Sequence, residues 1–177
     1  TARWEDLNAR ARGLGTHLLS GAQLNGLAQA PGVVALGEGL RRYGYPLEEG
    51  AASPATLELA LRRMAAGRLG LLARWCGPRT TVLTIVFEDE DRRSLRAVLR
   101  GAVQQAPADT RLAGLALTPA LPARALRELA HQTTPAAVAA LLTAWRNPYG
   151  SALLAAASAV QPDLFTLDLL VNRTFAE

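Results

Sequence analysis

The densest group of residues that could do chemistry lies at positions 88–93, which read Glu-Asp-Glu-Asp-Arg-Arg. Paired carboxylates of this kind can serve as general acid and base, or can hold a divalent cation. The alternative is a solvated helical turn in which Glu88 and Asp89 face Arg92 and Arg93 one turn later. We favour the solvated turn. Catalysis would require Asp89 or Asp91 to meet another polar group, and the sequence offers no partner for either.

The remaining reactive side chains form no recognised catalytic or metal-binding motif. The only histidines, His17 and His131, lie far apart in no zinc-binding pattern, and no serine stands in a Gly-x-Ser-x-Gly turn. The single cysteine, Cys76, excludes an internal disulfide framework and a zinc site built from several cysteines. Gly13 and Gly15 follow no strand, so they form no dinucleotide-binding fingerprint. The sequence therefore predicts no catalytic residue, no metal site and no bound cofactor.

The elements that must position these side chains are helices. Ala and Leu make up 67 of the 177 residues, whereas Val occurs nine times and Ile once. Such a composition favours helix almost throughout, and an apolar share of 50% supplies a real core. We expect an all-α, multi-helical fold with no significant sheet. Residues 81–87 resemble a strand, but no second run exists to pair with them, so they are predicted to begin a buried helix that continues to about residue 105.

Turn and capping signals divide the chain into further helices. Ser53-Pro54 and Thr134-Pro135 each provide an N-cap followed by a first-turn proline. Pro162-Asp163 opens the last helix. Expected helices cover residues 4–19, 33–43, 54–76, 81–105, 109–115, 122–131, 134–145, 150–160 and 162–177. Residues 21–32 are expected to form short broken pieces, because Gly21, Gly26 and Pro31-Gly32 interrupt them.

Every one of the 19 cationic residues is Arg, and the net charge is +4. No more than two Arg are adjacent, so the charge alone does not indicate nucleic-acid binding. Arg92, Arg96 and Arg100 recur at four-residue steps and form one basic stripe, which is either a partner surface or a solvated helix face. Guanidinium groups bind carboxylates and phosphates with two parallel hydrogen bonds, so partners carrying such groups would suit the stripe.

Three segments together resemble one protein family. Residues 7–19 contain an Asn-Ala-Arg step followed by a Leu-Leu pair, and residues 91–101 end in Leu-Arg-Ala-Val-Leu-Arg-Gly. Residues 117–150 contain Leu-Thr-Pro-Ala-Leu, a helix, and then Asn-Pro-Tyr-Gly. In this order they resemble the C/d-type stalk family of V-type and archaeal-type (V/A) rotary ATPases. Ser94 replaces the Asn, Ala102 the Lys and Ala120 the Gly that are usual in the family.

The resemblance implies a non-catalytic central-stalk component that couples the rotor shaft to the membrane ring in proton or sodium transport. Its partners would be the rotor-shaft subunits and the ring, and it would be cytoplasmic and peripheral to the membrane. The candidate partner-contact residues are Arg92, Arg96, Arg100, Arg10 and Arg12. The alternative function is a helical adaptor or nucleic-acid-binding module that uses an Arg-rich face.

The resemblance also bears on how the chain is organised. It covers the N-terminal half of the family's length, so residues 1–177 are expected to be one all-helical domain or fragment. A weak echo between residues 40–45 and 145–150 suggests two related helical units, with candidate sub-units at 1–106 and 107–177. The last helix carries no stop signal, which predicts an exposed apolar face at Leu164, Leu167, Leu170 and Val171.

Overall fold

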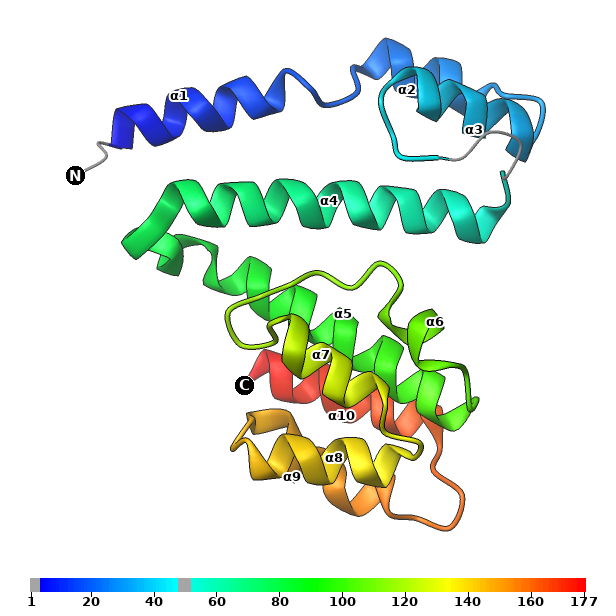
Figure 1. Cartoon of the computed structure of the whole chain (residues 1–177), viewed down its shortest axis with the longest axis vertical. Helices are drawn as coiled ribbons and strands as arrows, with labels where there is room; N and C mark the ends of the chain where they lie inside the picture. Colours follow the sequence, from blue (N-terminus) through cyan, green and yellow to red (C-terminus); the bar gives the residue numbers. More distant parts are fainter. Residues whose placement is uncertain (1–3, 48–51) are drawn as a thin grey trace. The chain divides into compact units, whose positions relative to one another are not determined.

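The computed structural model describes residues 4–47 and 52–177, and these residues form helices joined by short connections with no strand among them (Figure 1). The fold class predicted from the composition, all-α, is confirmed. The chain divides into two compact units, residues 1–81 and 82–177. The division falls before the helix at residues 84–103 rather than after it, because that helix packs against the helices that follow it.

The first unit holds four helices within its described residues. They are α1 (Trp4–Gly15), α2 (Gly21–Ala28), α3 (Val33–Arg42) and α4 (Pro54–Cys76). Ser53 caps α4 through the amide of Thr56, as predicted, and Gly77 ends it with a φ of 51°. The prediction that residues 21–32 form only broken pieces is wrong. Ser20 and Gln23 form a reciprocal capping box that starts α2.

The start of the chain is less buried than its periodicity indicates. α1 stops at Gly15 rather than near residue 19, and of its apolar stripe Leu7 alone is classed as buried, while Trp4 and Leu18 are at least half exposed. The two glycines near its end lower its helix propensity. Cys76 is a free thiol, buried at the end of α4.

The second unit begins in a 3₁₀ segment, η1 (Gly77–Leu83), that runs across the unit boundary. Its helices are α5 (Thr84–Val103), α6 (Ala108–Leu112), α7 (Ala123–Ala130), α8 (Pro135–Ala144), α9 (Pro148–Ala157) and α10 (Leu164–Ala176). Residues 81–87 are helical rather than extended, as predicted, but the α-helix begins only at Thr84. The expected burial of this stretch is wrong for Ile85 and Val86, which are exposed, whereas Phe87 is buried.

Caps explain most of the remaining boundaries. Thr134 caps α8 through an amide of its first turn, as predicted. The last helix is expected to open with Pro162-Asp163, but Asp163 is its N-cap and α10 begins at Leu164. The sequence predicts the next helix at residues 150–160, but Asn147 caps α9 so that Pro148 becomes its first residue. α9 ends at Ala157 and α6 ends at Leu112, each three residues earlier than expected.

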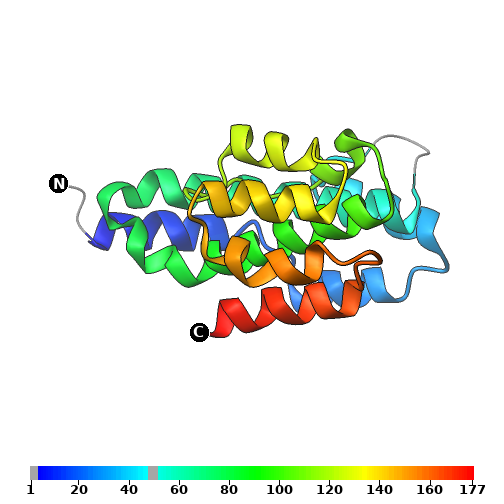
Figure 2. The same cartoon turned by 90° about the horizontal axis from the view of Figure 1, so that it is seen from below.

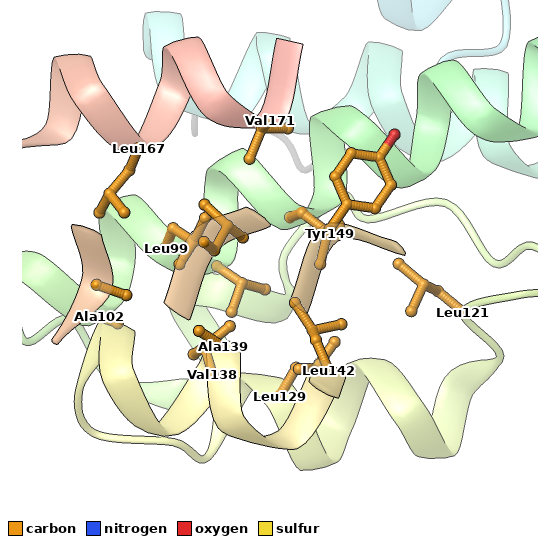
Figure 3. Packing of buried hydrophobic residues seen from close by; sticks show 14 of the residues in the cluster. Leu99, Ala102, Leu121, Leu129, Val138, Ala139, Leu142, Tyr149, Leu167 and Val171 are labelled. Atoms are coloured by element: carbon orange, nitrogen blue, oxygen red, sulfur yellow. The ribbon is translucent and has the colours of Figure 1, made fainter. Parts of the chain in front are cut away.

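The core of the second unit is a cluster of Leu, Val and Ala side chains contributed by α5, α7, α8, α9 and α10. α9 contacts both α8 and α10, and α10 contacts α5 (Figure 2). Leu167 and Val171 project from α10 toward the cluster that holds Leu99 and Tyr149 (Figure 3).

The predicted exposed face on the last helix is therefore wrong. Leu167 and Val171 are fully buried, and Leu164 and Leu170 are partly buried. The four residues belong to the side of α10 that packs on α5 and α9. The exposed apolar side chains of α10 are instead Phe165 and Leu169.

Candidate interaction surface

The basic stripe of α5 lies against α10. Arg96 donates a hydrogen bond from Nη2 to the Asp168 carboxylate at 2.8 Å, and Arg100 reaches the same oxygen at 3.2 Å. One turn earlier, Nη1 of Arg92 donates to Oδ1 of Asn172 at 2.7 Å. The helices are therefore joined by polar contacts beside the buried apolar face of α10. We call this group the α5–α10 clasp: Arg92, Arg96 and Arg100 on α5, with Asp168 and Asn172 on α10.

Arg92 is the most enclosed arginine of the clasp. Its guanidinium also pairs with Asp89 at 2.6 Å and lies 5.2 Å from the centre of the Phe175 ring. Its side chain is 20% exposed, against 32% for Arg96 and 52% for Arg100. Exposure thus rises along the stripe and is largest at Arg100.

The charges of the clasp stabilise one another. The hydrogen bond from Arg96 lowers the pKa of Asp168 below its ordinary value, and burial of the carboxylate opposes this effect. The same hydrogen bond raises the pKa of Arg96. Nε of Arg96 is buried and has no partner in the described part of the chain. The carboxylate of Asp168 is therefore the main compensation for that guanidinium.

The acidic run at residues 88–91 separates into two environments. Asp89 pairs with Arg93 at 2.8 Å and Glu90 pairs with Arg93 at 3.2 Å, as expected of a charged helical turn. Asp91 differs, because it points inward and is only 7% exposed. The interpretation of the whole run as a solvated turn is therefore wrong for this residue, which the helical repeat places on the same face as Phe87 and Leu95.

Asp91 meets a polar partner from a distant part of the sequence. The Thr118 hydroxyl donates to Oδ1 of Asp91 at 2.5 Å, and the same hydroxyl accepts a hydrogen bond from the Leu121 amide at 2.9 Å. Burial raises the pKa of Asp91 to about 6, despite the hydrogen bond from Thr118, and Glu88 and Glu90 add to the rise. Burial also raises the pKa of Tyr149, with a further contribution from the negative charge of Asp91.

Two of the sequence segments singled out by motif therefore come together here, residues 91–101 and residues 117–150. The contact between Thr118 and the acidic run was not predicted. The sequence signal that could have indicated it is a Thr before Pro in a tight turn, because the hydroxyl of such a Thr can form hydrogen bonds with the neighbouring backbone. The pair holds the α6–α7 connection against α5. These groups do not form a nucleophile with an oriented base. The described residues also include no group of three or more His, Cys, Asp or Glu that could hold a metal ion.

Arg10 and Arg12 lie on the exposed surface of α1. Neither forms an ion pair within residues 4–47 and 52–177. The five arginines singled out from the sequence therefore fall into two groups, the clasp in the second unit and an exposed pair in the first.

The family model for the ATP synthase (C/AC39) subunit matches residues 7–177. The chain belongs to this ATP synthase family. The match extends through both compact units and includes the clasp and the Asp91–Thr118 pair. No curated protein and no solved structure matched the chain.

As a member of the C/AC39 family, the chain is a component of a V/A-type ATPase complex, and the resemblance found in its three motif segments is confirmed. The family is an accessory one, generally without catalysis of its own. Among the described residues, no helix is both long enough and apolar enough to cross a bilayer.

Proposed function

We propose that the chain is a non-catalytic central-stalk component of a V/A-type rotary ATPase. It couples the rotor shaft to the membrane ring and so links ATP chemistry to transport of protons or sodium ions. The observation that carries this proposal is the family match across residues 7–177. In this role the chain lies at the cytoplasmic face of the membrane, bound to the complex rather than inserted in the bilayer.

The packing of the second unit supports a mechanical role. Eight of its leucine and valine side chains are completely buried, from α5, α7, α8, α9 and α10, together with Leu121. Close-packed interiors have low compressibility and transmit strain. The clasp adds directional bonds between α5 and α10, which limit sliding of one helix along the other. Torque applied at one side of such a unit is passed on rather than absorbed by internal rearrangement.

The arginines supply the proposed contacts with partners. Arg10 and Arg12 are exposed on α1, and the 52% exposed side chain of Arg100 retains donors that Asp168 does not use. Exposed guanidinium groups suit carboxylates on the shaft or ring. Arg92 and Arg96 contribute mainly by holding α10, so their substitution is expected to weaken the fold of the second unit before it weakens a contact.

The alternative, a nucleic-acid-binding module, receives less support from this arrangement. Three arginines of its proposed face are engaged with α10 side chains, which reduces the charge available to phosphates. A nucleic-acid-binding role predicts an affinity that falls steeply with salt and needs no other ATPase protein.

The test is affinity purification of the tagged product of the complete gene from its own cells, followed by mass spectrometry. We expect rotor-shaft and ring proteins in amounts comparable to the bait. The matched variants are Arg10→Gln with Arg12→Gln, compared with Arg124→Gln, which removes a charge from a 90% exposed side chain on α7. Loss of partners with the first pair alone assigns α1 to the contact. Recovery of nucleic acid without ATPase proteins would refute the proposal.

A further inference from the structure

A second feature of the second unit, separate from the clasp, is a cavity of about 550 Å³. It lies where α5 and α7 end and where α6 and α8 begin. Its polar lining consists of Gln105, Arg111, His131, Thr133 and Thr134, and the other lining residues are Ala and Pro. None of these lining residues carries a carboxylate. The lining is therefore rich in hydrogen-bond donors and has one fixed positive charge.

Arg111 supplies that charge and is almost completely enclosed, with 8% of its surface exposed. Nε donates to the Ala106 carbonyl at 2.7 Å, and Nη1 donates to the carbonyls of Ala130, at 3.2 Å, and Gln132. These carbonyls belong to the segments that end α5 and α7. The guanidinium is thus held in one orientation by three backbone acceptors, and this preorganisation reduces the entropy lost when a ligand binds.

The backbone of α5 is shaped to admit this side chain. A Cβ placed on Gly101 would lie 2.5 Å from Cγ and 2.9 Å from Cδ of Arg111. Any larger residue at position 101 would displace the stem of the arginine. The glycine therefore makes room for the guanidinium at the cavity wall.

The charge of Arg111 is not neutralised within the described chain. It forms no ion pair there, and the Asp109 carboxylate two residues away is exposed and does not reach it. Backbone carbonyls can accept the hydrogen bonds of a buried guanidinium, but they do not neutralise its positive charge. The second terminal nitrogen, Nη2, has no bond to any described residue and is not sealed from solvent. An anion in the cavity would provide the missing countercharge.

We propose that this cavity is an oxyanion-binding site and that its ligand carries a phosphate-type group. A tetrahedral oxyanion offers acceptors in several directions. The lining residues carry donors in the guanidinium, the imidazole of His131, the two threonine hydroxyls and the Gln105 amide. A carboxylate has only two oxygens in one plane and would leave part of this set unused. The site does not depend on the coupling role proposed above.

The test is titration of the full chain with sodium phosphate at constant ionic strength, followed by ¹H–¹⁵N NMR. The Arg111 Nε–H is a direct reporter, because it is enclosed and bonded to Ala106. We expect a saturable shift of this resonance with phosphate and with sulfate, and at least roughly tenfold weaker binding of acetate, the factor typical of one lost charge-assisted hydrogen bond.

Two surface variants and one control separate a built site from general attraction. His131→Gln and Thr133→Val change exposed lining residues that cap no helix with their side chains, so the fold is expected to persist. Their combination should weaken phosphate binding roughly tenfold or more. Arg127→Gln removes an exposed positive charge from α7 outside the cavity lining and should change affinity less than about twofold.

Other results would overturn the proposal. They are the absence of a saturable shift, equal binding of acetate and phosphate, or an equal loss of affinity in Arg127→Gln and in the lining variants. Equal binding of acetate would assign the cavity to acidic side chains instead of phosphate groups. Gly101→Ala provides an independent check. It should shift the Arg111 Nε–H signal without phosphate and reduce the response to added phosphate.

Discussion

The α5–α10 clasp makes a quantitative prediction for Asp168→Asn. The carboxylate of Asp168 accepts from Arg96 at 2.8 Å and from Arg100 at 3.2 Å, while its own side chain is 19% exposed. Asn keeps the size and the helix propensity of Asp almost unchanged. It also keeps one acceptor oxygen, so the substitution removes the charge and leaves a neutral hydrogen bond.

The expected cost follows from the exposure of each arginine. A hydrogen bond to a charged group contributes about 1.5–3 kcal/mol, roughly twice a neutral one, so neutralising the Arg96 contact costs about 1 kcal/mol. The longer contact with the half-exposed Arg100 adds no more than about 0.5 kcal/mol. Asp168→Asn should therefore destabilise the second unit by about 1–1.5 kcal/mol. The half-buried guanidinium of Arg96, whose Nε already has no partner, would then have less compensation.

The assay is native-state hydrogen exchange of the α5 and α10 amides, because it reports the second unit without contributions from the first. The matched control is Glu128→Gln, whose partner Arg124 is 90% exposed, and this change should cost clearly less than Asp168→Asn. The clasp is refuted as a stabilising element if the two variants have equal effects. The lowered pKa of Asp168 adds a pH test. The ionised carboxylate contributes its full stability above the ordinary pKa of 3.8, and this stability is lost as the pH falls below that value. The free energies of unfolding of wild type and variant should therefore converge in acid.

Three further substitutions test the packing of the second unit. Gly150→Ala should destabilise the second unit by about 1–3 kcal/mol in urea unfolding. The new Cβ would lie 2.6 Å from the backbone carbon of Leu142 and 2.7 Å from Cα of Thr143, so an unchanged midpoint would contradict the close approach of α8 and α9. Arg146→Gly should stabilise the second unit by up to about 1 kcal/mol in the same assay, because Arg146 follows α8 with a positive φ of 56°, which glycine adopts more readily. A loss of stability would show that the contacts of its side chain outweigh the strain of its backbone. Asp91→Asn should raise the free energy of unfolding at neutral pH. Burial raises the pKa of Asp91 to about 6, so wild type loses stability as the pH rises from 3.8 to 6 and the buried carboxyl becomes charged. A variant whose stability falls with the same slope over this pH range would refute the assignment.

Much of the helical framework could be predicted from local chemistry. The N-caps at Ser53 and Thr134 lie where their residue types predict them, because each cap bonds an amide only three residues further along the chain. Sequence reasoning misses α2 for a related reason. Its capping box requires Gln23 to reach back to Ser20, and this cap outweighs the glycines that suggest a broken segment.

The polar contacts of the second unit were beyond sequence reasoning. The Arg stripe was visible from its four-residue spacing, but its partner Asp168 lies on a helix 72 residues from Arg96. Asp91 and Thr118 are likewise brought together by the packing of the α6–α7 connection on α5. Arg111 showed no pattern at all, because its three acceptors are backbone carbonyls that leave no trace in residue types. Periodicity identifies which residues share a helix face, but only tertiary packing decides what that face meets.

Affinity purification of the complete gene product under native salt conditions decides whether the protein couples the rotor shaft to the membrane ring. We expect rotor-shaft and membrane-ring proteins of a V/A-type ATPase to be recovered together with the bait. Arg10→Gln with Arg12→Gln should reduce their recovery, whereas Arg124→Gln should not. A well-folded bait that recovers no other ATPase protein would contradict the coupling role.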